Sequence, residues 1–210
     1  GDTDNAAFTI AGDSLKLNAP ADFETKESYS LRVEGTDLGG LTFAKALTVS
    51  VTNANDAPVI TSAATANAAE NQTAVATVVA TDVDEGDSLT FSLTGGADQA
   101  LFDIVGATGV LTFKAAPNFE APSDAGADNA YNVEVTVSDG ALTDVQALTI
   151  NVTDVNDAPI DIALDNAAIA ENGAADAVVG KFTLADVDGS GDPVIITEGV
   201  GEKKWEFETG

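Results

Sequence analysis

The sequence has no cysteine and no histidine among its 210 residues. Without cysteine, disulfide bonds and thiolate metal sites are excluded, and without histidine the common zinc sites and histidine-based acid–base catalysis are excluded as well. No apolar run approaches the roughly 18 to 20 residues that a membrane-spanning helix needs, so we expect no membrane insertion. Any core in this chain must therefore be held by packing alone.

Basic residues are also scarce, because 8 lysines and arginines stand against 35 aspartates and glutamates and the formal net charge is -27. Phosphate recognition needs clustered basic side chains, so nucleic acid is disfavoured as a partner, and an anionic membrane surface is disfavoured for the same reason. Charge of one sign strains a compact state through self-repulsion unless counter-ions bind. Cations are therefore the natural partner.

Aromatic residues make up only 6% of the chain, whereas hydrophobic residues make up 44%. This apolar content, mostly alanine, valine, isoleucine and leucine, is sufficient for packed cores. Three of the aromatic residues lie in strand-like patterns and are expected to be core residues, namely Phe91, Phe102 and Phe182.

Alternation of apolar and polar residues is the dominant local pattern. Tyr131, Val133, Val135 and Val137 alternate with polar residues, and residues 89–93, 47–51 and 148–152 contain similar runs. A period of two buries one face of a sheet. About seven such runs, separated by turn residues, fit into roughly 100 residues, and no segment has a sustained helical period. The sequence therefore predicts an all-β fold of seven-stranded antiparallel β-sandwiches of the immunoglobulin-like, Greek-key type.

An internal repeat organises the chain. The segment TDVNDAPI at residues 153–160 has a near-copy, TNANDAPV, at residues 52–59. Other motifs recur in step, namely Ala-Glu-Asn at 69–71 and 170–172, Asp-Val-Asp at 82–84 and 186–188, and x-Phe-Glu at 22–24 and 118–120. Their order predicts three domains: the second half of a repeat at 1–57, a complete repeat at 58–158, and the first half of a further repeat at 159–210.

The recurring motifs are rich in the ligands that hard cations prefer. Calcium takes about six to eight oxygen ligands in flexible geometry, whereas magnesium is more demanding and keeps its waters. Any one of these motifs alone is explained as an ordinary turn. Their recurrence in step favours a shared set of cation ligands instead.

This ordered motif set resembles the calcium motifs of cadherin repeats. The forms Asn-Asp-Ala-Pro and Asp-Phe-Glu or Asn-Phe-Glu, at residues 55–58, 22–24 and 118–120, are similar to those in cadherin-like repeats of large bacterial surface proteins and adhesins. The resemblance implies an elongated array of tandem sandwiches, located outside the cell or at its surface, with Ca²⁺ bound between consecutive repeats. It implies no enzymatic activity and no catalytic residues.

The resemblance also implies a ligand set at each junction, drawn from the upstream repeat, the linker and the downstream repeat. The first junction would use Asp22, Glu24, Asn53, Asn55, Asp56, Asp82, Asp84 and Asp139. The second would use Glu70, Asn118, Glu120, Asp154, Asn156, Asp157, Asp186 and Asp188.

Four positions depart from this motif set or lack the rest of their junction. Asn53 and Asn118 stand where an acidic ligand is expected, so we expect at least one weaker ion at each junction and weaker binding at the first than at the second, unless Asp139 compensates. Glu171 and Asp37 match motifs whose junctions are mostly absent from these residues, so we expect them to stand idle.

Three functions follow as hypotheses. The first is a non-enzymatic, calcium-stiffened extender or adhesion segment of a large extracellular bacterial surface protein, which works through neighbouring repeats and a surface receptor. The second is a carbohydrate-binding module, for which Trp205 would be the glycan contact if it is not a strand residue. The third is a head-to-tail filament subunit, because half a sandwich cannot bury two sheet faces. Another copy of the chain would then complete it; the alternatives are that the halves are loosely ordered or that an inserted domain has been removed.

Overall fold

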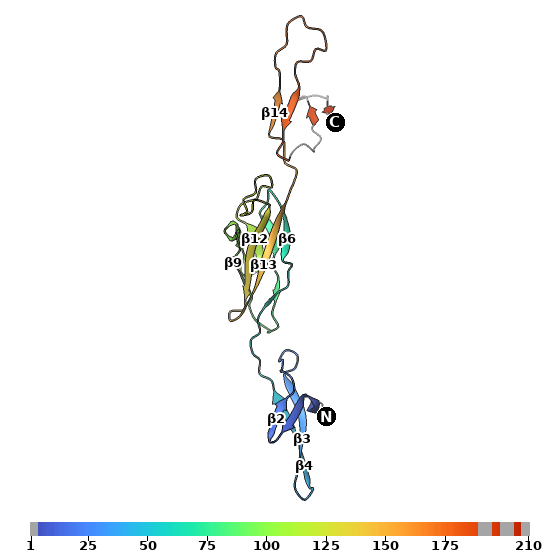
Figure 1. Cartoon of the computed structure of the whole chain (residues 1–210), viewed down its shortest axis with the longest axis vertical. Helices are drawn as coiled ribbons and strands as arrows, with labels where there is room; N and C mark the ends of the chain where they lie inside the picture. Colours follow the sequence, from blue (N-terminus) through green and yellow to red (C-terminus); the bar gives the residue numbers. More distant parts are fainter. Residues whose placement is uncertain (1–3, 189–194, 198–203, 207–210) are drawn as a thin grey trace.

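The computed structural model describes residues 4–188, 195–197 and 204–206. It is elongated, with three units in succession along one long axis (Figure 1). We call residues 4–50 the N-terminal unit, residues 58–153 the central unit and the residues from 159 on the C-terminal unit. The first linker (residues 51–57) and the second linker (residues 154–158) join them. The β-sheets lie within these units, whereas the repeat boundaries stay a prediction.

The central unit is a sandwich of two sheets. A four-stranded sheet has the order β6-β13-β12-β9, a three-stranded sheet has the order β10-β11-β7, and β5 pairs with β8. The bounds are β5 (Val59–Ile60), β6 (Thr65–Ala69), β7 (Ala74–Thr77), β8 (Ala80–Thr81), β9 (Thr90–Gly95), the 3-10 helix η2 (Gln99–Leu101), β10 (Phe102–Ile104), β11 (Val110–Phe113), β12 (Ala130–Ser138) and β13 (Thr143–Thr153).

The alternating residues of β12 and β13 form the core of this sandwich. Tyr131 is 1% exposed and its ring contacts those of Phe102 and Phe113 edge-on, with centroids 6.0 Å and 5.1 Å apart. The buried Tyr131 hydroxyl also accepts a hydrogen bond from the backbone N–H of Ser123 at 3.2 Å. Packing of this kind holds the two sheets together without a disulfide bond.

The fold class predicted from the sequence is confirmed, with two differences in detail. The sequence predicted about seven strands, whereas the central unit has nine, with β5 and β6, and likewise β7 and β8, as separate short strands. In addition, β6 pairs with β13 in parallel, Thr65 opposite Thr149 and Ala69 opposite Thr153, whereas we expected antiparallel neighbours throughout. The parallel pairing brings the end of β6 beside the second linker.

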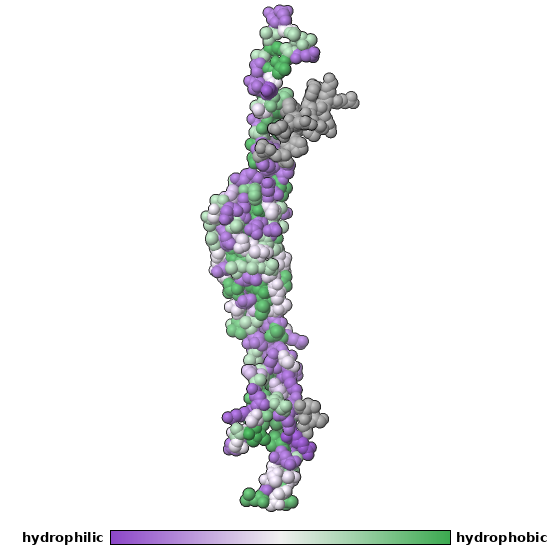
Figure 2. Space-filling model, turned by 45° about the vertical axis from the view of Figure 1, so that its right-hand side comes forward, coloured by the Kyte–Doolittle hydropathy of each residue, from purple (hydrophilic) through white to green (hydrophobic). Residues whose placement is uncertain are grey.

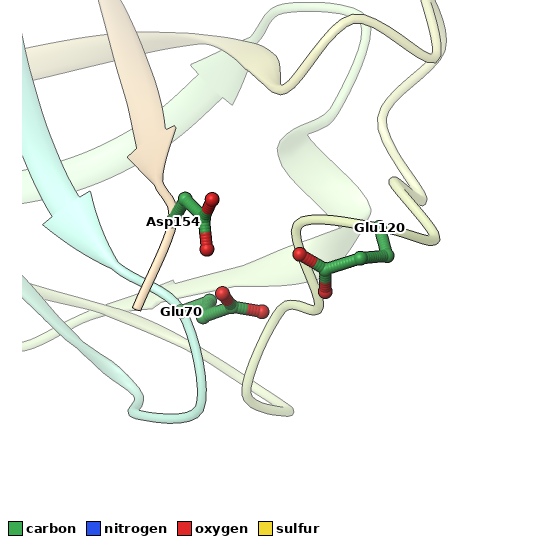
Figure 3. Close-up of side chains that lie close together, drawn as sticks. All are labelled: Glu70, Glu120 and Asp154. Carbon is green, nitrogen blue, oxygen red and sulfur yellow. The ribbon is translucent and has the colours of Figure 1, made fainter. Parts of the chain in front are cut away.

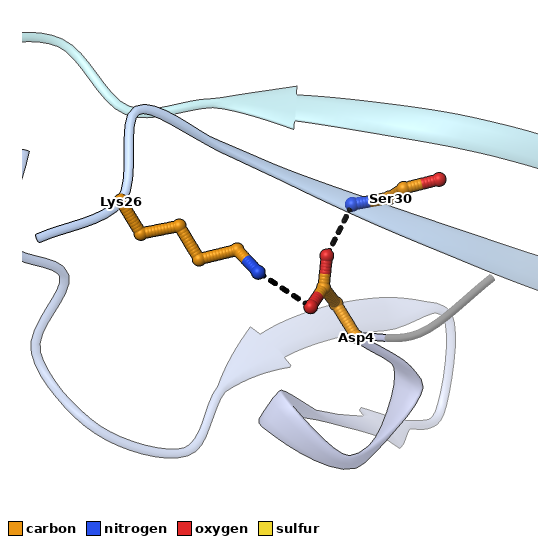
Figure 4. A network of polar contacts seen from close by, with 3 residues as sticks. All are labelled: Asp4, Lys26 and Ser30. Carbon is orange, nitrogen blue, oxygen red and sulfur yellow. Dashed lines mark hydrogen bonds and ion pairs between the residues drawn. The ribbon is translucent and has the colours of Figure 1, made fainter. Parts of the chain in front are cut away.

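The N-terminal unit contains η1 (Asn5–Ala7) and two hairpins, β1 (Phe8–Ala11) with β2 (Ser14–Leu17) and β3 (Ser28–Thr36) with β4 (Thr42–Ser50). Asp4 ties the two hairpins together, because its carboxylate accepts hydrogen bonds from Lys26 Nζ at 2.6 Å and from the backbone N–H of Ser30 at 2.7 Å (Figure 4). Only Leu31 is buried among its large apolar side chains in the described residues.

The C-terminal unit pairs β14 (Asp161–Leu164) with β15 (Phe182–Ala185), and β16 (Ile195–Thr197) with β17 (Lys204–Glu206). Phe91 and Phe102 are core residues at 8% and 2% exposure, as predicted, but the prediction for Phe182 was wrong because it is 48% exposed. Its strand β15 pairs with β14 alone among the described residues. Trp205 lies in β17, and its side chain is outside the described part. The helices of the described residues are short 3-10 turns, and none could span a bilayer.

Candidate metal centres at the linkers

Hydrophilic side chains gather where the linkers join the units (Figure 2). At the second linker, Glu70 stands at the end of β6 and is 2% exposed. Its Oε2 accepts a hydrogen bond from the backbone N–H of Phe119 at 2.7 Å, and its Oε1 accepts one from Val155 at 2.9 Å. A single buried carboxylate therefore fixes the loop before Glu120 against the linker.

Three carboxylates converge at this point. Glu70, Glu120 and Asp154 each place an oxygen within 4.8 Å of the others, and Figure 3 shows their carboxylates directed toward a common space. They come from the end of β6, from a loop of the central unit and from the linker. Elements far apart in the sequence thus contribute to one acidic group.

A second acidic group continues the first across the linker. Glu120 also lies within the same 4.8 Å limit of Asp157 in the linker and Asp188 in the C-terminal unit. Asp157 donates its backbone N–H to the Asp188 carboxylate, and Asn71 donates from Nδ2 to Asp157 Oδ1 at 2.8 Å. Glu120 is therefore shared by two groups that together span the junction.

The electrostatics of this junction are unfavourable without a cation. A hydrogen bond to its own backbone N–H acts to lower the pKa of Glu120, but burial and the charges of Glu70, Asp154 and Asp188 outweigh it and raise the pKa above its ordinary value. The Oδ1 atom of Asp188 is buried and has no hydrogen-bond partner among the described residues. Both observations fit a position at which a cation would relieve charge repulsion.

The first linker is organised around Asp84, which is 9% exposed. The Asp84 carboxylate accepts two hydrogen bonds from the linker. Its Oδ2 accepts one from the backbone N–H of Asp56 at 2.7 Å, and its Oδ1 accepts one from Nδ2 of Asn53 at 2.8 Å. The hydrogen bond from Asp56 lowers the pKa of Asp84 most, followed by that from Asn53. Asp84 therefore stays ionised and holds the linker against the central unit.

Further carboxylates surround Asp84. Asp82, Asp84 and Asp87 lie within 4.8 Å of one another, and Asp82 Oδ2 is buried without a hydrogen-bond partner among the described residues. Burial first, and then the charges of Asp82, Asp84 and Asp139, raise the pKa of Asp87. Asp139 reaches the linker from the β12–β13 turn, where its Oδ2 accepts Nδ2 of Asn55 at 2.8 Å.

The N-terminal unit contributes Glu24 to this junction. The hydrogen bond to its own backbone N–H acts to lower the pKa of Glu24, but burial and the charges of Asp84, Asp56 and Asp22 raise it overall. A cavity of about 310 Å³ lies beside it, lined by Asp22, Phe23, Glu24 and the linker residues from Val51 to Asp56 except Asn53. Carboxylates of two units and the linker therefore face each other here as well.

Four predicted ligands make local hydrogen bonds, three of them through side-chain oxygens and Asn156 through its amide nitrogen. Asp22 accepts hydrogen bonds from the backbone and hydroxyl of Thr25, each at 2.9 Å, and Asn118 Oδ1 accepts the backbone N–H of Ala121 at 2.7 Å. Asn156 donates to the carbonyl of Asp157, and Asp186 accepts the backbone N–H of Asp188. These residues shape the turns beside the acidic groups.

Asp87 was missed by the sequence reasoning. The signal was the third aspartate in the run Asp-Val-Asp-Glu-Gly-Asp at residues 82–87, which the recurring Asp-Val-Asp pattern does not include. Asp37, which was expected to stand idle, accepts the backbone N–H of Leu41 at 2.8 Å within the β3–β4 turn. Glu171 is exposed.

The ligand atoms of the acidic groups at both linkers fit a hard divalent cation. All the closely spaced ligands are carboxylates, which suit calcium rather than softer transition metals. The orphaned oxygens of Asp82 and Asp188 are the atoms that a cation would satisfy.

Comparison with known proteins agrees with this fold. The family described as "Bacterial Ig domain" matches residues 55–151. The human protein "Cadherin EGF LAG seven-pass G-type receptor 2" is 31% identical over 159 residues, a match that covers 71% of this chain and 5% of that protein. The Caenorhabditis elegans receptor fmi-1 of the same description is 38% identical over 88 residues, covering 40% of this chain and 3% of the receptor.

Solved structures show the same architecture. Extracellular cadherin domains 3–6 of protocadherin gamma B2 superpose with a TM-score of 0.61 and 19% identity, over 92% of this chain and 52% of that one. Domains 1–4 of protocadherin gamma B7 give a TM-score of 0.56 with 22% identity, over 95% of this chain and 54% of that one. The motifs, the sandwich and these matches lead to one conclusion: the chain is built from cadherin-like repeats.

Proposed function

We propose that this chain is a calcium-stiffened extender segment of an extracellular bacterial surface protein, without enzymatic activity. The observation that carries the proposal is the position of Glu120, which is shared by two acidic groups drawn from the central unit, the second linker and the C-terminal unit. Because a cation held there contacts both sides of the linker, its binding is coupled to the relative position of the two units.

Calcium supplies positive charge where carboxylates crowd. At the second linker Glu70, Glu120, Asp154, Asp157 and Asp188 would hold it. Asn118, Asn156 and Asp186 would shape the surrounding turns. Without the ion these carboxylates repel one another across the linker, so the units separate or swing apart. With the ion bound, the same carboxylates are attracted to one cation, and the linker becomes stiff.

The first linker has the same construction with less acidic charge at one position. Glu24, Asp56, Asp82, Asp84 and Asp139 would be its acidic ligands, with Asp87 in addition, and Asp22 and Asn55 beside them. Asn53 stands where the second linker has Asp154, and it already donates a hydrogen bond to Asp84. We therefore expect weaker calcium binding at the first linker.

The extracellular and bacterial parts of the proposal rest on the chemistry of the sites and on the matched family. Sites of this kind in extracellular modules bind calcium with dissociation constants of about 0.1 to 1 mM, which suits the calcium level outside cells. The family matched by residues 55–151 is described as a bacterial domain, and the net charge of -27 suits a calcium-rich medium. The chain spans 5% or less of the length of the cadherin receptors that it matches. The proposal therefore names no individual receptor or ligand, only the class of surface receptor.

A calcium titration of matched variants tests the function. Glu120→Gln removes the shared charge, and Glu134→Gln removes an exposed charge on β12 as the control. By calorimetry, we expect Glu120→Gln to weaken the tighter binding step about tenfold or more, the size expected from the loss of a calcium-ligand charge, and Glu134→Gln to leave it unchanged. Equal affinities for the two variants would refute the site.

A further inference from the structure

The loop between β11 and β12 carries Glu120 to the second linker and is held in shape by a buried carboxylate of its own. Asp124 is 6% exposed, and its oxygens accept the backbone N–H groups of Asp128 and Asn129, each at 3.1 Å. Asn129 has a φ of 63°, in the left-handed region that asparagine adopts more readily than most residues. The loop therefore returns to β12 through a fixed turn at Asn129.

Asn129 contacts both the strand that leads to the linker and the loop that carries Glu120. Its backbone carbonyl accepts the N–H of Val152 at 2.9 Å. Its side-chain Nδ2 donates to the backbone carbonyl of Phe119 at 2.8 Å. Val152 lies two residues before Asp154, and Phe119 directly precedes Glu120. One residue thus joins the two segments that carry Asp154 and Glu120.

The bond to Phe119 acts on the peptide group between Phe119 and Glu120. A peptide group is planar, so a fixed Phe119 carbonyl also fixes the direction of the Glu120 N–H. That N–H hydrogen-bonds the carboxylate of Glu120 itself. On its other side, Phe119 donates its own N–H to Glu70 Oε2 at 2.7 Å. The direction of the Glu120 carboxylate toward its acidic group (Figure 3) therefore depends on Asn129.

The side-chain amide of Asn129 has one orientation that suits this position. The Phe119 carbonyl can only accept hydrogen bonds, so the amide nitrogen must face it. This leaves Asn129 Oδ1 buried without a hydrogen-bond partner among the described residues, which is unfavourable. Glycine adopts the same φ and would avoid the unpartnered oxygen. The turn alone therefore does not explain the amide, whereas its bond to Phe119 does.

The first linker has the backbone part of this arrangement without the amide. Glu27 corresponds to Asn129, because its carbonyl accepts the N–H of Val51 at 2.8 Å where β4 ends. An ionised carboxylate has no hydrogen to donate, so Glu27 cannot hold the carbonyl of Phe23 as the amide holds that of Phe119. Glu24 therefore lacks this restraint.

We propose that Asn129 is a positioning residue of the second linker, where its amide raises the calcium affinity by holding Glu120 in place. The calcium part of this inference rests on the proposed function, whereas the restraint on the Phe119 peptide group does not. The restraint is a second reason, beside the charge of Asp154, for tighter binding at the second linker than at the first.

Two glycine substitutions in one loop test the restraint in the full chain. Asn129→Gly suits the φ of 63° and removes the amide. Ala127→Gly is the matched control, because Ala127 is exposed and has a φ of 52° in the same loop. In EDTA, the Phe119 amide proton should exchange with solvent about fivefold faster in Asn129→Gly than in wild type, the size expected from the loss of one hydrogen bond. Exchange should be unchanged in Ala127→Gly. Equal exchange in both variants would overturn the restraint.

Calorimetry then separates positioning from stability. The calcium-binding step that Glu120→Gln weakens is the step of the second linker. Asn129→Gly should weaken this step about tenfold, the lower end of what the loss of an outer hydrogen bond to a metal ligand costs, and Ala127→Gly should leave it unchanged. A purely structural amide would alter the melting temperature in EDTA but not the calcium affinity, and that result would refute the positioning role.

The same titrations distinguish a failure of this inference from a failure of the proposed function. If Glu120→Gln weakens a binding step and Asn129→Gly does not, the calcium site stands and the role of Asn129 is wrong. If Glu120→Gln weakens no step, the proposed function is wrong, and with it the calcium role of Asn129. The exchange rates in EDTA decide the restraint on Phe119 in either case.

Discussion

Glu70 offers the sharpest test of how the second linker is built. Replacing it by alanine removes the acceptor for two backbone N–H groups, those of Phe119 and Val155. Val155 is 44% exposed, so water can replace the lost acceptor there. Phe119 packs against the core, and its N–H is left without a partner. An unsatisfied buried donor costs about 1 to 3 kcal/mol.

Calcium should change the size of this effect. In EDTA, the loss of the Glu70 charge also relieves part of the repulsion on Glu120, so we expect a net destabilisation near the lower end of that range. A loss of 1 kcal/mol lowers the melting temperature of a unit of this size by about 4 to 8 °C. In calcium, Glu70→Ala also forfeits ion binding, which at a concentration ten times the dissociation constant contributes about 1.4 kcal/mol.

The assay is thermal unfolding followed by circular dichroism, with and without calcium. Glu134→Ala, an exposed change on the outer face of β12, is the matched control and should leave both melting temperatures almost unchanged. Glu70→Gln keeps one acceptor and should lie between wild type and Glu70→Ala in EDTA. A Glu70→Ala protein that melts with wild type in EDTA would show that the carboxylate does not hold the loop.

Three further predictions concern the central unit. Burial acts to raise the pKa of Asp124, but backbone N–H groups of its own loop outweigh it and hold the pKa below the ordinary 3.8. The stability that Asp124 contributes is therefore present above that pH and lost below it, so Asp124→Asn should flatten the acid limb of a pH-stability profile; an unchanged limb would contradict this. Tyr131→Phe removes the acceptor for the Ser123 N–H and should cost about 0.5 to 1.5 kcal/mol in urea unfolding; no loss would mean that the bond is not formed. Gly109 has a φ of 69°, and a Cβ there would lie 2.2 Å from the Val78 carbonyl oxygen. Gly109→Ala should therefore lower the free energy of unfolding by more than the roughly 1 kcal/mol of an unfavourable φ alone. A loss of melting temperature smaller than that free energy implies would refute the clash.

Much of the fold was predictable because it follows from local pattern. The alternation around Tyr131 places one side of β12 in the core, and a period of two requires no knowledge of the neighbouring strands. The repeated motifs predicted which carboxylates gather, and Glu70, Glu120 and Asp154 do so. Recurrence at domain spacing supplied the long-range information that a single motif lacks.

The features that the sequence did not predict have a common physical cause. Each depends on contacts that no local pattern in the sequence reveals. Phe182 has a core-like pattern, but burial needs packing beyond the pairing of β15 with β14, and the side chain is 48% exposed. The parallel pairing of β6 with β13 depends on contacts more than 80 positions apart in the sequence, so no local pattern indicates its direction. Asp87 joins its acidic group through the fold of one loop rather than through a repeated position.

The most direct test of the calcium clamp is to locate the ions. Crystals grown in millimolar calcium, measured at a long X-ray wavelength, would reveal bound calcium as anomalous difference density. We predict peaks among Glu70, Glu120 and Asp154, among Glu120, Asp157 and Asp188, and beside Asp84 at the first linker. Linkers without an anomalous peak under these conditions would contradict the proposal that the repeated carboxylates are a calcium clamp.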